Sequence, residues 1–241
     1  MKIFFIVLAV LVACVCAYWI WNFSYKYNIS KRLIQEAKAY SIEGSDFSKT
    51  LLVMGDSTGV GVGASRPEDS VAGRLAVAMR ATYVENRSVS GAMVADLATQ
   101  MADVSRERYD TVLIQIGAND IVHFHNAQET ADALLPFVQK AKTMSDEVIV
   151  ISAGNMGAVT NFPFPIRLFY TNLTLKYHAA FTAMATKTGA VYVNLYTSPD
   201  KDPFKAHPEI YLAADGFHPS SEGYGLWFER LKATVQEHEA E

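Results

Sequence analysis

The pattern of apolar and polar positions divides the chain into an apolar N-terminal segment and a longer region of alternating element types. Beyond residue 50, short apolar runs typical of buried strands alternate with stretches in which apolar residues recur at helical spacing. Such an alternation predicts a parallel sheet covered by helices on both faces. We expect strands at residues 51–54, 82–89, 112–116, 148–151 and 191–195.

The first 23 residues predict a membrane-spanning helix. Residues 3–21 carry no charge and are almost wholly aliphatic or aromatic. At a rise of about 1.5 Å per residue they would span roughly 28 Å as a helix, close to the thickness of a bilayer core. Aromatic side chains, which favour the membrane interface, gather at the far end as Tyr18, Trp19, Trp21, Tyr25 and Tyr27. We therefore expect a retained membrane anchor.

Two other fates of this segment stay open. Small residues at Val15-Cys16-Ala17 fit a signal-peptidase site, and cleavage there would remove the segment. The run that ends at Cys14 resembles a lipobox, which would make the protein a lipoprotein. The side of the membrane is also open. Four basic residues between positions 26 and 38 favour a cytoplasmic domain, whereas the signal-like start of the chain favours an extracytoplasmic one, which we expect.

Residues 24–49 are predicted to connect the membrane to the folded domain. Leu33, Ile34 and Ala37 fall on one face of a short polar helix over residues 29–43, which Gly44 would end. The domain would then occupy residues 50–241, an ordinary size for a single hydrophobic core.

Charge and cysteine content exclude some classes of function. The net charge is −4, and no dense run of lysine and arginine follows the connector, so we expect no nucleic-acid partner. Both cysteines, Cys14 and Cys16, lie in the N-terminal segment. The folded domain therefore has no disulfide and no thiolate nucleophile.

Four short blocks carry candidate chemistry, and each could be an ordinary turn if it stood alone. Ser57 follows the first predicted strand, Gly91 the second and Asn119 the third, while Asp215 and His218 stand three residues apart near the C-terminus. Ligand sites of parallel sheets form at the carboxyl ends of their strands. Together the blocks supply a nucleophile, oxyanion donors, a base and a carboxylate that orients the base.

This set of blocks resembles the SGNH hydrolases, also called GDSL-type hydrolases, a family of esterases, lipases, thioesterases and carbohydrate deacetylases. Ser57 matches the nucleophile of the Gly-Asp-Ser block, Gly91 and Asn119 match the second and third blocks, and Asp215 with His218 matches the Asp-x-x-His pair. The stretches GDSTGVGVGASRPEDSVAGRLA and ADGFHPSSEGYGLW also resemble bacterial members. The resemblance covers roughly residues 51–231.

The resemblance implies a flavodoxin-like, three-layer α/β/α sandwich with a five-stranded parallel sheet. It implies a catalytic triad of Ser57, His218 and Asp215. It also implies an oxyanion hole formed by the backbone N–H groups of Ser57 and Gly91 and by the Asn119 side chain. Such a site hydrolyses carboxylic esters through an acyl-enzyme and needs no cofactor and no metal. We therefore expect a serine ester hydrolase that acts on a small-molecule, lipid or glycan ester.

The same residues leave other functions open. An acyltransferase would use the triad with an alcohol acceptor in place of water, and a carbohydrate O-deacetylase would use it on acetylated sugars. A lipid- or glycan-binding module would keep the fold without catalysis, although an intact triad argues against it.

Three further patterns have ordinary explanations that we favour. His123 and His125 form a His-x-His pair, but no third metal ligand is placed nearby. Gly59 and Gly61 fit the spacing of a dinucleotide-binding fingerprint. In such a fingerprint the helix starts at the glycines, whereas the capping signals here start the next helix further along the chain. The proline-stiffened segment 161–165 is best explained as core packing or a structural loop, and its functional alternative is an acyl-pocket or membrane-facing lip.

Overall fold

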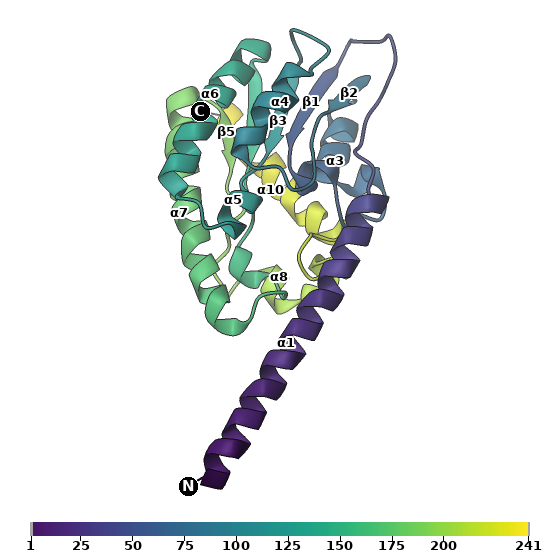
Figure 1. Ribbon diagram of the computed structural model, residues 1–241. Helices are drawn as coiled ribbons and strands as arrows, with labels where there is room; N and C mark the ends of the chain where they lie inside the picture. The colour runs from purple at the N-terminus through teal and green to yellow at the C-terminus, as the bar shows by residue number, and fades with distance from the viewer. Residues whose placement is uncertain (1, 241) are drawn as a thin grey trace.

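A computed structural model describes residues 2–240 as one long apolar helix followed by an α/β domain (Figure 1). Five strands form one sheet in the order β2-β1-β3-β4-β5, and all neighbouring strands are parallel. The strands are β1 (Thr50–Gly55), β2 (Tyr83–Asn86), β3 (Thr111–Gln115), β4 (Glu147–Ile151) and β5 (Val191–Val193). The predicted fold class is confirmed, although β2 and β5 end before the predicted runs do.

Helices cover both faces of the sheet and so complete three layers. Because side chains alternate along a strand, Leu52 and Met54 of β1 join one core cluster and Leu51 and Val53 join the other. The first cluster also takes side chains of α4 (Leu97–Ala102), α6 (Ala127–Met144) and α7 (Phe164–Thr188). The second takes side chains of α3 (Val71–Ala78) and α10 (Ser221–Glu239).

Short elements follow the carboxyl ends of the strands, where the sequence predicts the site. They are α2 (Ser57–Val60), α5 (Ala118–Val122), α8 (Pro203–Ala206), α9 (Pro208–Tyr211) and the 3-10 turns η1 (Pro67–Asp69), η2 (Val94–Asp96) and η3 (Met156–Ala158). Parallel strands bring these connections to one edge of the sheet.

The helix α1 runs without a break from Lys2 to Glu36. The prediction of a separate polar helix over residues 29–43 is therefore wrong. Residues 22–36 contain no glycine or proline, so nothing in the chain ends the apolar helix where its composition turns polar. By length and composition α1 can cross a membrane, a property that it shares with signal sequences.

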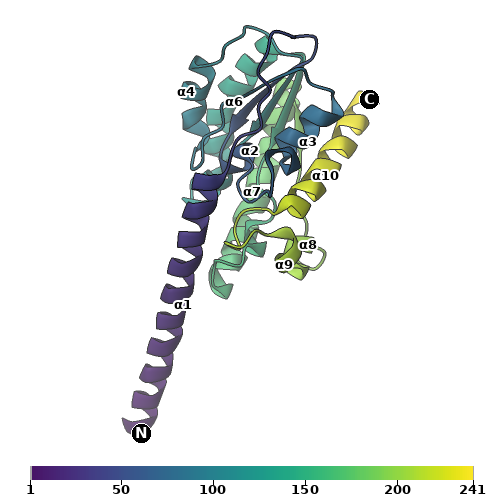
Figure 2. The same cartoon turned by 90° about the vertical axis from the view of Figure 1, so that its right-hand side faces the viewer.

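One face of α1 lies against the domain. Half-buried positions recur three or four residues apart, which places them on one side of the helix, at Trp19, Asn22, Lys26, Ile29 and Leu33. Figures 1 and 2 show the N-terminal half of α1 leaving the domain at its lower end, where α8 and the start of α7 also lie. Beyond α1, Ile42 forms an antiparallel bridge with Val84 of β2.

Candidate active site

Ser57 is the first residue of α2, directly after β1, and the turn that carries it is tightly held. Asp56 caps the helix, since its Oδ1 accepts hydrogen bonds from the backbone N–H and the hydroxyl of Thr58, both at 2.8 Å. The buried side chain of Gln100 brackets Gly55 by accepting from its N–H at 2.8 Å and donating to its carbonyl at 2.9 Å. These bonds fix the end of β1 and the position of the serine.

Ser57, His218 and Asp215 form one hydrogen-bonded row. His218 Nε2 lies 3.0 Å from Ser57 Oγ, and His218 Nδ1 lies 2.6 Å from Asp215 Oδ2. The other carboxylate oxygen of Asp215 accepts from the backbone N–H groups of Phe217 at 2.9 Å and His218 at 3.1 Å. All three side chains of the row are buried. Because the carboxylate accepts from Nδ1–H, Nε2 is left to accept the serine proton.

The carboxyl of Asp215 keeps its negative charge despite complete burial. Burial alone would raise its pKa, but the hydrogen bond and charge of His218 and the two backbone N–H donors outweigh that effect. The pKa of Asp215 therefore lies below its ordinary value. A charged carboxylate holds the imidazole in one tautomer and one orientation.

Two other buried acids stand beside the row, and burial raises the pKa of both. The pKa of Asp56 rises to about 6 because desolvation exceeds the stabilising bonds from Thr58. Asp120 accepts from the backbone N–H of Val94 at 3.2 Å and lies 3.4 Å from His125 Nδ1. Through these contacts Asp120 connects α5 to η2.

The predicted oxyanion donor Gly91 lies in the turn after β2, and the other, Asn119, lies in α5. Asn119 Nδ2 donates to the carbonyl of Ala92 at 2.8 Å, which uses one of the two amide hydrogens and leaves the other for a ligand. Gly91 has a φ of +87°, and no atom lies within 4 Å of the place where a β-carbon would stand. The bond from Asn119 to Ala92 holds α5 against the turn that carries Gly91, and the role of both residues in catalysis stays a prediction.

The loop between Asp215 and His218 is held by contacts that sequence reasoning missed. The carbonyl of Gly216 accepts from the N–H of Thr160 at 3.1 Å and from its hydroxyl at 3.3 Å, and Lys26 of α1 donates to that hydroxyl at 2.9 Å. Gly216 has a φ of +64°, and a β-carbon there would lie 2.3 Å from Thr160 Oγ1. The only sequence signal was the glycine itself, because Lys26 and Thr160 are 134 residues apart.

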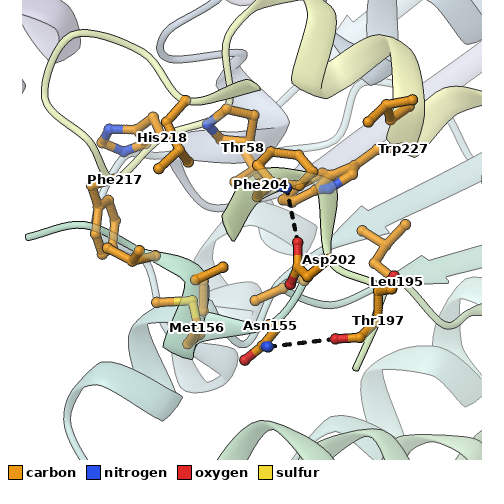
Figure 3. A pocket seen from close by; sticks show the side chains of 18 of the residues that line it. Thr58, Asn155, Met156, Leu195, Thr197, Asp202, Phe204, Phe217, His218 and Trp227 are labelled. Atoms are coloured by element: carbon orange, nitrogen blue, oxygen red, sulfur yellow. Dashed lines mark hydrogen bonds between the residues drawn. The ribbon is translucent and has the colours of Figure 1, made fainter. Parts of the chain in front are cut away.

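A cavity of about 230 Å³ opens beside Ser57 and His218 and runs under α10. Figure 3 shows its labelled walls, in which Asn155 donates to the carbonyl of Thr197 at 3.4 Å. The larger side chains around the cavity are mostly apolar and include Met156, Val159, Leu195, Phe204, Phe217, Leu226 and Trp227. The cavity therefore suits an apolar part of a ligand next to the serine.

The histidine pair has local partners. His123 Nδ1 lies 2.8 Å from the carbonyl of Asn119, and His125 faces Asp120. Within residues 2–240, no group of three or more histidine, cysteine or acidic side chains is arranged to hold a metal ion. Both histidines therefore belong to the turn after α5.

A comparison of the sequence with known families points to the same kind of site as the hydrogen-bonded row. The model of the GDSL-like lipase/acylhydrolase family matches residues 53–226. The chain belongs to this family. The resemblance drawn from the four blocks is thereby confirmed, and this GDSL-family chain carries all four of them in the matched region.

Known proteins resemble the GDSL-family chain in sequence or in fold. A GDSL-like esterase of Mycobacterium tuberculosis is 28% identical over 189 residues, which are 75% of this chain and 59% of the relative's length. A lipolytic G-D-S-L protein from Veillonella parvula has a TM-score of 0.60 at 15% identity and covers 77% of this chain and 97% of its own. An acetyl-xylooligosaccharide esterase from Geobacillus has a TM-score of 0.57 at 21% identity, and the match covers 80% of this chain and 96% of the esterase. The two structures bear on the fold alone.

Proposed function

We propose that this GDSL-family chain is a serine ester hydrolase that cleaves carboxylic esters through an acyl-enzyme. The observation that carries the proposal is the row in which His218 lies 3.0 Å from Ser57 Oγ and 2.6 Å from Asp215. A serine hydroxyl is a weak nucleophile until an adjacent base accepts its proton. The row supplies that base and the carboxylate that orients it.

The reaction proceeds in two matched halves. His218 Nε2 takes the Ser57 proton as Oγ bonds to the ester carbonyl carbon. The tetrahedral intermediate then collapses, the bond to the alkoxy oxygen breaks, and His218 gives its proton to the leaving alcohol. Water attacks the acyl-enzyme by the same path, which releases the carboxylic acid and restores the serine. Asp215 stabilises the imidazolium throughout and stays ionised.

Three N–H donors serve the oxyanion in this mechanism. The backbone N–H of Ser57 is the first of α2, where helical geometry leaves N–H groups without an intrahelical acceptor. Gly91 has open space beside its α-carbon, and Asn119 retains one amide hydrogen. Donors aimed at developing charge stabilise the transition state more than the ground state.

We also infer that α1 is retained as a membrane anchor and that the domain lies outside the cytoplasm. The charge-free run over residues 3–21 exceeds the apolar core of a signal peptide, which is about 7–15 residues long. The aromatic cluster that follows fits an interfacial belt. The extracytoplasmic side is favoured by the signal-like start of the chain.

Covalent labelling of the full chain in detergent tests the hydrolase. A fluorophosphonate should label wild-type protein at Ser57, and p-nitrophenyl acetate should be cleaved. Ser57→Ala should abolish both, whereas Ser48→Ala, at an exposed serine outside the site, should change neither. Circular dichroism should show that both variants are folded.

The results that contradict the proposal are specific. Folded wild-type protein that takes no label and cleaves no ester would be a binding module. Labelling at a serine other than Ser57 would remove the proposed nucleophile. Transfer of the acyl group to added alcohol that outruns hydrolysis would make the protein an acyltransferase.

A further inference from the structure

Five apolar side chains around the start of α7 are exposed to solvent, and we call them the apolar lip. Their exposed fractions range from 42% to 71%, and they are Phe124, Phe164, Ile166, Leu168 and Phe169. Scattered exposed apolar residues are ordinary, but a cluster of large ones indicates a surface that meets another apolar body.

Phe124 is held in an unfavourable backbone conformation at this surface. Its φ is +60°, a region that bulky side chains rarely adopt. The residue is 58% exposed, and its ring packs edge-on against Phe169, with centroids 5.4 Å apart. Backbone strain of this kind persists where surrounding structure enforces it, and it concentrates at functional surfaces.

The apolar lip is continuous with the active site through a chain of aromatic rings. Phe124 stacks on Tyr170 at 5.4 Å, Tyr170 on Phe162 at 4.4 Å, and Phe162 meets Phe217 edge-on at 6.3 Å. Phe217 lines the cavity and packs against the ring of His218 at 5.0 Å (Figure 3). A continuous row of packed aromatic rings therefore joins the lip to His218.

A second link joins the apolar lip to the cavity wall. Arg167, in the first turn of α7, donates to the carbonyl of Gly157 at 2.8 Å and to that of Ala158 at 3.2 Å. On either side of these residues, Met156 and Val159 line the cavity. The start of α7 is thus fastened to the cavity wall.

The apolar lip and the apolar half of α1 lie at the same end of the domain. Figures 1 and 2 both show the start of α7 at the lower end, toward which the N-terminal half of α1 extends. The hydrogen bond from Lys26 to Thr160 ties α1 to the loop that precedes α7. Because α1 is one unbroken helix, this contact fixes the end that faces the membrane.

We propose that the apolar lip docks into the surface of the bilayer that α1 spans, and that the cavity takes an ester lipid from that leaflet. The proposal rests on the proposed hydrolase and on the retained anchor. The bilayer is the occupant that the chain itself brings to this surface, because a helix that can span it extends from the end of the domain at which α7 starts. Exposed aromatic and aliphatic side chains gain free energy when they enter the interface.

Fluorescence quenching by lipids tests the docking. The label is the environment-sensitive nitrobenzoxadiazole dye, attached to a single cysteine of the full chain in phosphatidylcholine vesicles. The native Cys14 and Cys16 are first replaced by alanine, and Leu168→Cys then places the dye on the lip. Val77→Cys is the matched control, because Val77 is 62% exposed and precedes β2 at the opposite end of the sheet. A chain that retains only Cys14 reports insertion of α1.

A shallow doxyl-lipid should quench the dye on residue 168 at least about threefold more strongly than the dye on residue 77. The emission of the dye on residue 168 should also shift to the blue. Equal quenching at the two positions refutes the docking. A blue shift at 168 without lipid quenching assigns the lip to a second copy or another protein, which also refutes it. A Cys14 label that escapes quenching by a deep doxyl-lipid refutes the anchor and the docking together.

Activity on two esters tests the substrate class and separates it from the hydrolase itself. In Phe164→Ser/Leu168→Ser, cleavage of an ester lipid in vesicles should fall at least about tenfold, while cleavage of soluble p-nitrophenyl acetate stays within about twofold. Equal losses on both esters, or none on either, contradict a lipid substrate. Wild-type protein that cleaves neither ester refutes the hydrolase, and the quenching then decides the docking alone.

Discussion

Replacement of Asp56 by asparagine should change how the stability of the protein depends on pH. Asp56 is buried, and its pKa is about 6 compared with 3.8 for the ordinary carboxyl. Between these values the unfolded chain releases a proton that the folded protein keeps, so stability is lost as pH rises through this window. One pKa unit corresponds to about 1.36 kcal/mol, so the full loss is about 3 kcal/mol.

The asparagine variant keeps the geometry and removes the titration. Its side-chain oxygen can still accept from Thr58 and cap α2. The second oxygen of Asp56 has no hydrogen-bond partner among residues 2–240, so an amide there loses no bond and adds at most a cost that is independent of pH. Because the unfolded carboxyl is already more than half ionised at pH 4, Asp56→Asn should gain about 2 kcal/mol relative to wild type between pH 4 and pH 8.

Guanidinium unfolding of the full chain in detergent at half-unit steps from pH 4 to pH 8 measures this gain. Asp132→Asn is the control, because Asp132 is exposed on α6 and its removal should shift the curve little. Stability curves of wild type and Asp56→Asn that run parallel over the whole range would falsify the assignment of a raised pKa to the buried carboxyl.

Three other outcomes are expected. Asp215→Asn should lower kcat/KM for p-nitrophenyl acetate by about four orders of magnitude in a folded variant, since its amide would favour the wrong tautomer of His218; a loss under tenfold contradicts this. Asn119→Ala should lower kcat by about 100-fold to 1000-fold with little change in KM, and a change in KM alone would make Asn119 a binding residue. Full-length protein should stay in membranes during alkaline carbonate washing, and a mature N-terminus at Tyr18 would show cleavage instead.

The sequence predicts the parts of this fold that depend on local pattern. Apolar runs mark four of the five strands, the exception being β2, and parallel strands bring to one edge of the sheet the carboxyl ends that Ser57 and Asn119 follow. Asp215 and His218 stand three residues apart, so a single turn brings their side chains together. The hydrogen bond between Asp215 and His218 follows from this short-range geometry, whereas the one between Ser57 and His218 joins residues 161 apart and was expected from the resemblance to the SGNH hydrolases.

The contacts that surround this core of the site could not be predicted in the same way. Gln100 clamps Gly55 across 45 residues of chain, and Lys26 reaches Thr160 across 134. Neither pair leaves a periodicity or a motif in the sequence. The predicted helix boundary falls inside α1 because the composition turns from apolar to polar there. Such a change alters the surroundings that a helix prefers, but it does not end the helix.

The bridge between Ile42 and Val84 governs where the chain can be shortened. β2 is an outer strand, and outer strands offer unpaired backbone groups to other molecules. Ile42 exchanges two hydrogen bonds with Val84, at 3.1 and 3.0 Å, and Tyr40 packs beside it on the core. A soluble version that begins at residue 38 keeps this edge closed, whereas one that begins at residue 50 exposes it to aggregation between strands.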